Sequence, residues 1–105
     1  MCTLYYNGSN TLAAGSPTTF DSSGNTYRIN TCYFPPTQRT LVAYRDYSTG
    51  YPKGRSISLS GTTPSAGAAT TIASTGTYVM DSVYDVFTEL IAYVYVNNSS
   101  NVLAG

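Results

Sequence analysis

The sequence predicts an all-β fold, a small antiparallel sandwich or barrel of about six to eight short strands. Eleven of the 105 residues are Tyr, and Tyr, Thr and Val favour a pleated, half-buried surface. Polar and apolar residues alternate over short segments such as RSISLS at 55–60, as in strands with one face in the core. Turn signals recur at a spacing typical of sandwiches and barrels.

In the first part of the chain the signals predict two hairpins. Segments 3–7 and 11–14 flank an Asn-Gly pair, whose residues tolerate the positive φ of a tight turn. Segments 18–21 and 26–32 flank the sequence SSGN, a second hairpin signal. The Pro35-Pro36 pair is interpreted as the end of this unit, since proline cannot donate to a strand ladder.

The middle of the chain predicts strands at 40–47, 55–60 and 70–74. In the second of these, the alternation places Ile57 and Leu59 together on the core side. The small residues of 61–69 are expected to form a loop.

Residues 77–97 permit two interpretations. With period two, 78–80 and 90–96 are strands joined by a turn. With helical spacing, Asp81 is an N-cap and one apolar face runs along a helix near 82–94, which changes the class to α+β. Because β-branched and aromatic residues lower helix propensity, strands are preferred.

The length of 105 residues fits one β-rich domain spanning the whole chain. Residues 98–105 are expected to be a flexible tail, or a tail that pairs with a neighbouring chain through Val102 and Leu103. An unpaired sheet edge is a template for such pairing.

Charge is scarce: 10% of the residues are charged and the formal net charge is zero, against about 25% charged residues in a typical domain. Nucleic acid as a partner is not expected, because it requires a basic surface. No apolar run is long enough for a transmembrane helix. The first residues lack the pattern of a signal peptide, so the chain is expected either to bypass the secretory route or to be a mature fragment with an added Met.

The two cysteines, Cys2 and Cys32, are compatible with a disulfide that ties the first strand to the end of the third. Two reduced, partly buried thiols are the other interpretation, since the redox compartment is unknown. Cys2 as the lipid-bearing first residue of a lipoprotein is less favoured, because strand-like residues follow it at once.

No catalytic residue, metal site or cofactor is predicted, and the chain is not expected to be an enzyme. It has no His, which removes the commonest general base and zinc ligand. Asp81, Asp85 and Glu89 are spaced by four residues and could form an acid pair or a Ca²⁺ site on a helix. A solvated helix face or turn is the preferred interpretation.

One stretch combines aromatic rings with cations. Three of the eleven Tyr and four of the five basic residues fall in positions 39–55, and such rings and cations can hold sugars or a partner's acidic and aromatic groups. Arg39 begins this stretch and Arg45 lies within it. In the competing interpretation, Tyr44 is buried in the core and the other side chains of the stretch are solvated. The predicted binding residues are Tyr44, Tyr47, Tyr51, Lys53 and Arg55.

These observations predict a non-catalytic structural protein that contacts other protein subunits, as a homo-oligomer or in a larger assembly. A composition rich in Ser, Thr and Tyr and poor in charge is typical of proteins that lie outside cells or in large assemblies. A virus particle would reconcile this composition with the lack of a signal-peptide pattern. The expected role is therefore a phage capsid-decorating or tail-associated subunit of the virion. The alternative is an extracellular or cell-surface carbohydrate-binding or adhesive module, with Tyr47 and Tyr51 as the platform on which glycans stack.

Overall fold

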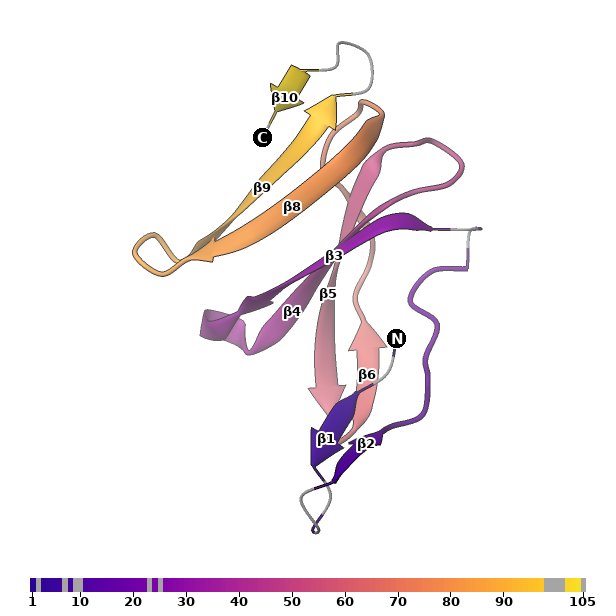
Figure 1. Cartoon of the computed structure of the whole chain (residues 1–105), viewed down its shortest axis with the longest axis vertical. Helices are drawn as coiled ribbons and strands as arrows, with labels where there is room; N and C mark the ends of the chain where they lie inside the picture. The colour runs from indigo at the N-terminus through magenta and orange to yellow at the C-terminus, as the bar shows by residue number, and fades with distance from the viewer. Residues whose placement is uncertain are drawn as a thin grey trace.

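The computed structural model describes residues 1, 3–6, 8, 11–22, 24, 26–97 and 102–104, and these residues form an all-β fold, as predicted (Figure 1). Three antiparallel sheets have the layered arrangement of a small sandwich. No helix among the described residues has the length and hydropathy needed to cross a bilayer. The strands are β1 (Leu4–Tyr6), β2 (Leu12–Ala14), β3 (Tyr27–Phe34), β4 (Arg39–Arg45), β5 (Pro52–Ser60), β6 (Thr63–Ala66), β7 (Thr70–Thr71), β8 (Thr77–Asp85), β9 (Leu90–Asn97) and β10 (Val102–Ala104).

The largest sheet has the order β3-β4-β5-β6, and β7 also pairs with β5. The predicted hairpin between 18–21 and 26–32 is wrong: β3 pairs instead with β4, with Cys32 opposite Leu41. The prolines interpreted as the end of a unit form the 3-10 turn η1 (Pro35–Thr37), which joins β3 to β4. Proline suits this place because its fixed φ starts a helical turn, and Gln38 closes the turn with a φ of +53°.

Residues 18–21 lie outside the strands because they cover one face of the large sheet. Phe20 packs with Met1 against the buried side chains of Val42, Tyr44 and Ile57. The terminal amino group of Met1 donates to the Thr18 carbonyl oxygen at 2.7 Å. A long-range hydrophobic contact therefore outweighs the local hairpin signal.

The expectation of a loop at 61–69 is also wrong in part, because β6 pairs with β5 there. Gly61 makes the sharp turn with a φ of +60°, which glycine adopts at little cost. Ile57 reaches the core as predicted, but Leu59 is 59% exposed. Leu59 lies opposite Pro64 near the end of β5, beyond the residues that cover the core.

Segment 82–94 is a hairpin and not a helix. β8 and β9 pair antiparallel, with Tyr84 opposite Ile91 and Asp85 opposite Leu90. The turn is closed by the Glu89 amide, which donates to the Asp85 carbonyl oxygen at 2.9 Å. β10 extends this sheet by pairing with β9 of the same chain, while 98–101 and 105 of the expected tail lie outside the described residues.

The hydrophobic core is small. The buried hydrophobic residues described are Val42, Ala43, Tyr44 and Ile57. Fifteen large hydrophobic side chains among the described residues are instead exposed, from β1 to β9. Among the described residues, exposed large hydrophobic side chains therefore outnumber the buried hydrophobic ones.

Candidate functional site

Two of the predicted binding residues, Tyr44 and Arg55, belong to an internal network. Tyr44 is completely buried, and its ring meets that of Phe20 edge to face with centroids 5.2 Å apart. Its hydroxyl donates to the Asp21 carboxylate and accepts from Arg55 Nε at 3.3 Å. Arg55 also donates to the Gly67 carbonyl oxygen at 2.9 Å, and its Nη2 lies 3.8 Å from Asp21 Oδ2. Burial, and then the bond to Asp21, raise the pKa of the Tyr44 phenol. Both side chains thus hold the segment around Asp21 to the sheet.

A third predicted residue, Lys53, anchors the turn between β4 and β5. Its Nζ lies 3.3 Å from Oδ2 of the fully buried Asp46. That carboxylate also accepts hydrogen bonds from Thr49 Oγ1 at 2.7 Å and Ser48 Oγ at 2.8 Å, as Asp does at the start of a turn. The Thr49 and Ser48 bonds hold the pKa of Asp46 far below its usual range. The half-buried Tyr51 continues the turn, since its amide donates to Thr49 Oγ1 at 3.2 Å.

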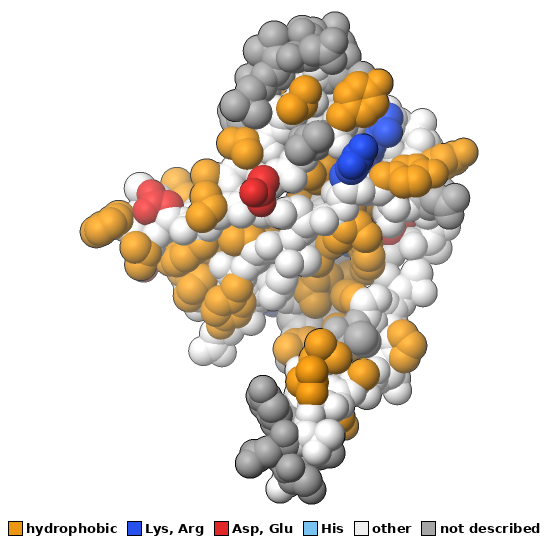
Figure 2. All heavy atoms as spheres, viewed as in Figure 1, with side chains coloured by type: hydrophobic (Ala, Val, Ile, Leu, Met, Phe, Trp, Pro, Cys, Tyr) orange, Lys and Arg blue, Asp and Glu red, His pale blue; other side chains and the backbone are white. Residues whose placement is uncertain are grey.

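Tyr47 projects from this turn into a surface cluster of rings and cations, the tyrosine–arginine patch, which consists of Tyr27, Arg28, Arg45, Tyr47 and Tyr78. The rings of Tyr27 and Tyr47 lie 6.1 Å apart, centroid to centroid, and the Arg45 guanidinium carbon lies 5.6 Å from the centre of the Tyr78 ring. The three tyrosines are 44–59% exposed. Figure 2 shows basic side chains between hydrophobic ones on this side of the molecule.

The patch is assembled from three strands. Tyr27 at the start of β3 lies opposite Arg45 at the end of β4. A register shift follows Tyr27, and Arg28 within it has a φ of +56°. Such bulges re-aim side chains, and Arg28 is exposed beside a pocket of about 310 Å³ that Tyr27 and Arg45 also line. β8 contributes Tyr78, and the Thr77 amide before it donates to the Gly50 carbonyl oxygen at 3.2 Å. The patch can bind aromatic, sugar or anionic groups by stacking and ion pairing.

Sequence reasoning selected Tyr47 of this patch, and it included Arg45 in the wider aromatic and basic stretch. It missed Tyr27, Arg28 and Tyr78, because they are distant in the chain and strand pairing brings them together. The one local signal was the Tyr27-Arg28 pair itself, an aromatic residue beside a cation.

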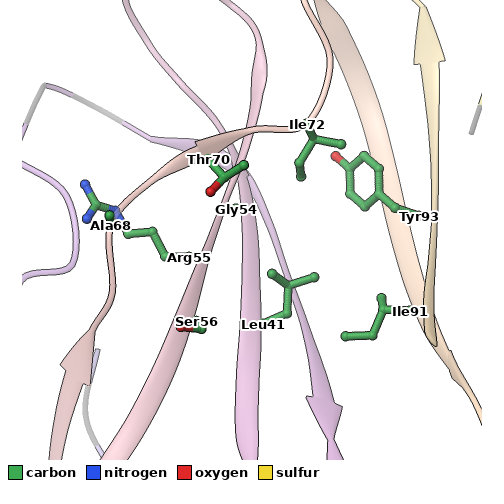
Figure 3. A pocket seen from close by; sticks show the side chains of 9 residues that line it. All are labelled: Leu41, Gly54, Arg55, Ser56, Ala68, Thr70, Ile72, Ile91 and Tyr93. Carbon is green, nitrogen blue, oxygen red and sulfur yellow. The ribbon is translucent and has the colours of Figure 1, made fainter. Parts of the chain in front are cut away.

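A second concave feature lies between the two larger sheets (Figure 3). The side chains of Leu41, Ile72, Ile91 and Tyr93 point toward one another around a pocket of about 350 Å³. Tyr93 directs its hydroxyl to the Met80 sulfur at 2.9 Å, and burial raises its pKa to about 12. Arg55, Ser56 and Thr70 also border the pocket, but most of its lining is apolar, so we interpret it as a gap in the packing between the two sheets.

The three acidic residues spaced by four lie on the β8–β9 hairpin. Asp81 accepts a hydrogen bond from Asn30 Nδ2 of β3 at 2.9 Å. Asp85 accepts from Thr88 Oγ1 at 2.8 Å and from the Phe87 amide at 3.0 Å, and these bonds lower its pKa. Asp85 therefore caps a turn, and the helical spacing that would align the acids is not present.

The remaining predictions concern cysteine and metal ligands. Cys2 lies outside the described residues, so the disulfide stays a prediction; its proposed partner Cys32 is half-buried on β3. Among the residues that the structure describes, no three His, Cys, Asp or Glu side chains gather as metal ligands would.

In comparisons with known proteins, no family model matches the chain. No curated protein and no solved structure matches it either.

Proposed function

We propose that this chain is a non-catalytic assembly protein that works through contacts with other protein subunits, as a homo-oligomer or within a larger assembly. The observation that carries the proposal is the balance of apolar side chains. Fifteen large hydrophobic residues are exposed, against four hydrophobic residues buried, among those described. Apolar surface in water is unfavourable, and large exposed patches mark interaction sites.

The shape supports the same proposal. The radius of gyration is 15.1 Å, against about 13 Å for a compact domain of this length. The extents of 51 × 36 × 23 Å describe an elongated molecule with projecting hairpins (Figure 1). Projecting strands rich in Tyr, Val and Leu offer rigid contact area at small cost in side-chain entropy.

The setting we propose is a virus particle, with the chain as a phage capsid-decorating or tail-associated subunit. Its support is compositional: a zero net charge, few charged residues, and a polar surface supplied by Ser, Thr and Tyr.

The test is the state of assembly of the purified chain. Light scattering and sedimentation velocity over a concentration series are expected to show defined oligomers, and cryo-electron microscopy is expected to show them as symmetric particles or attached to a shell. A chain that stays strictly monomeric at the highest concentration, and attaches to no shell, would overturn the proposal.

One observation favours a second function, an extracellular carbohydrate-binding or adhesive module. Exposed rings of Tyr27 and Tyr47 lie side by side at 6.1 Å, with Arg28 exposed next to them, and sugars stack on such rings. Glycan-array binding is then expected to be lost in Tyr47→Ala. The matched control is Tyr33→Ala, which removes a ring of similar exposure, 54% against 59% for Tyr47, on β3 outside the patch. Silence of the wild type across a broad array would exclude this alternative.

A further inference from the structure

The charged side chains sort into internal pairs and two separate sets of opposite sign. Lys53 pairs with Asp46 and Arg55 with Asp21. All the other charged side chains lie at described positions and form no salt bridge there. The three carboxylates among them are on the β8–β9 hairpin, whereas the three arginines are on β3 and β4: Asp81, Asp85 and Glu89 against Arg28, Arg39 and Arg45.

The acidic set is adjacent in the chain to the most exposed apolar side chains that the structure describes. At the turn between β8 and β9, the side chain of Phe87 is 93% exposed, and Val86 and Leu90 beside it are 67% and 64% exposed. Asp85 directly precedes Val86 in the chain, and Glu89 directly precedes Leu90. Here "the hairpin tip" means residues 85–90. Within the tip, the Asp85 carboxylate accepts hydrogen bonds from the Phe87 amide and the Thr88 hydroxyl, which close the turn.

The tyrosine–arginine patch is complementary to the hairpin tip in its exposed rings, which match the apolar side chains of the tip, and in its positive charge, which matches the negative charge of the tip. It has exposed rings, a concave pocket of about 310 Å³, and the exposed cation of Arg28. The two features lie on opposite sides of the molecule, since the turn between β8 and β9 points away from the end where β3 begins and β4 ends (Figure 1). In Figure 2 the basic side chains lie on the side opposite this turn, and acidic side chains lie near the turn and in the middle of the view. Within one chain, therefore, the hairpin tip does not contact the tyrosine–arginine patch.

We propose that the hairpin tip of one copy docks on the tyrosine–arginine patch of a second copy, with Phe87 among the tyrosine rings and Glu89 facing Arg28. This inference rests on the proposed assembly function and names the partner as this chain itself. The contact joins two different surfaces, so it is heterologous and generates a ring or a filament rather than a closed two-fold dimer. Opposite charges also fix the register and suppress the alternative tip-to-tip contact.

The test uses two charge reversals in the full-length chain. Arg28→Glu places a carboxylate opposite Glu89 of the docked tip, and Glu89→Arg places a guanidinium opposite Arg28 of the patch. Each variant alone is expected to self-associate at least about tenfold more weakly than the wild type, since like charges across an interface are costly. A mixture of the two variants restores complementary charges at every contact, and it is expected to assemble again with the copies alternating.

Two further variants complete the design. Phe87→Ser is expected to weaken association by about tenfold or more, as truncation of an aromatic anchor does. Arg39→Glu is the matched control, because it reverses an exposed arginine outside the patch and is expected to leave assembly unchanged. Circular dichroism checks that every variant is folded.

The outcomes separate the two proposals. If the wild type neither self-associates nor attaches to a shell, the assembly function itself fails. If it attaches to a shell but does not self-associate, the assembly function stands and the docking of tip on patch is overturned. If it associates but the single reversals have no effect, or the mixture does not recover, then assembly stands and the docking of tip on patch is overturned.

Discussion

Lys53 and Asp46 form an ion pair, with Nζ 3.3 Å from Oδ2, that fastens β5 to the turn following β4. The carboxylate is fully buried, whereas the lysine side chain is 26% exposed. The hydrogen bonds from Thr49 and Ser48 lower the Asp46 pKa more than the lysine does. The turn that presents Tyr47 is thus held chiefly by bonds within itself.

This arrangement makes the protein sensitive to acid. The folded pKa of Asp46 lies below its ordinary value of 3.8, so the unfolded state takes up the proton first as the pH falls. The contribution of Asp46 to stability is complete above about pH 5 and is lost progressively below about pH 4, toward the folded pKa. In Asp46→Asn we expect a free energy of unfolding lower by about 2 kcal/mol at neutral pH and a shallower decline with acid. Urea unfolding at a series of pH values measures both.

The matched variant is Lys53→Met, which removes the ion pair and keeps the turn's own hydrogen bonds. Because the lysine is partly exposed, its loss is expected to cost about 0.5–1 kcal/mol. A cost equal to that of Asp46→Asn would contradict the assignment of the main role to Thr49 and Ser48.

Removing the hydroxyl of the buried Tyr44 is expected to lower the free energy of unfolding more than removing that of Tyr47. Tyr44→Phe removes a hydroxyl that bridges Asp21 and Arg55, and a hydrogen bond to a charged group is worth about 1.5–3 kcal/mol. Tyr47→Phe, at a ring 59% exposed, is expected to change stability by less than about 0.5 kcal/mol. Since the chain has no Trp, tyrosine fluorescence reports the unfolding. Equal effects of the two changes would count against the internal network.

Tyr93 gives a prediction at alkaline pH. Burial raises its folded pKa to about 12 from the ordinary value of 10.0. Stability that depends on the neutral phenol is therefore fully present below about pH 10 and is lost as the pH rises through the folded pKa. Tyr93→Phe is expected to reduce the alkaline decline of the urea midpoint. Some decline should remain, because the pKa of Tyr44 is raised as well. An unchanged pH profile would show that Tyr93 is solvated in the folded chain.

Because a pocket lies between the sheets, we expect a methyl side chain to be tolerated at Gly54. A methyl group there would lie 3.3 Å from Leu41 Cδ1 and 3.5 Å from Ile72 Cδ1, both ends of side chains that border the pocket of about 350 Å³. Gly54→Ala is therefore expected to raise the free energy of unfolding by about 0.5–1 kcal/mol, because Gly within a strand is unfavourable. Gly61→Ala is the opposite control, since its φ of +60° strains any side chain. A lower melting temperature for Gly54→Ala would show that Leu41 cannot move.

Local patterns were sufficient for the class of this fold. Alternation and turn residues predicted strands near β4, β5, β8 and β9, and the β-branched and aromatic residues of 82–94 correctly favoured a hairpin over a helix. These signals work because side-chain direction in a strand follows from sequence parity alone. In the structure, Val42 and Tyr44 are buried on one face of β4, and Leu41 lines the pocket on the other.

Long-range packing decided the rest. Segment 18–21 has the composition of a strand, yet Phe20 packs on Tyr44 and the segment covers the core. Lys53 and Arg55 were predicted to bind a partner, but they form ion pairs with carboxylates of the same chain. The tyrosine–arginine patch arose from pairings between β3 and β4 and from the position of β8. Such contacts join residues far apart in sequence, and their free energy depends on three-dimensional proximity, which no local pattern encodes.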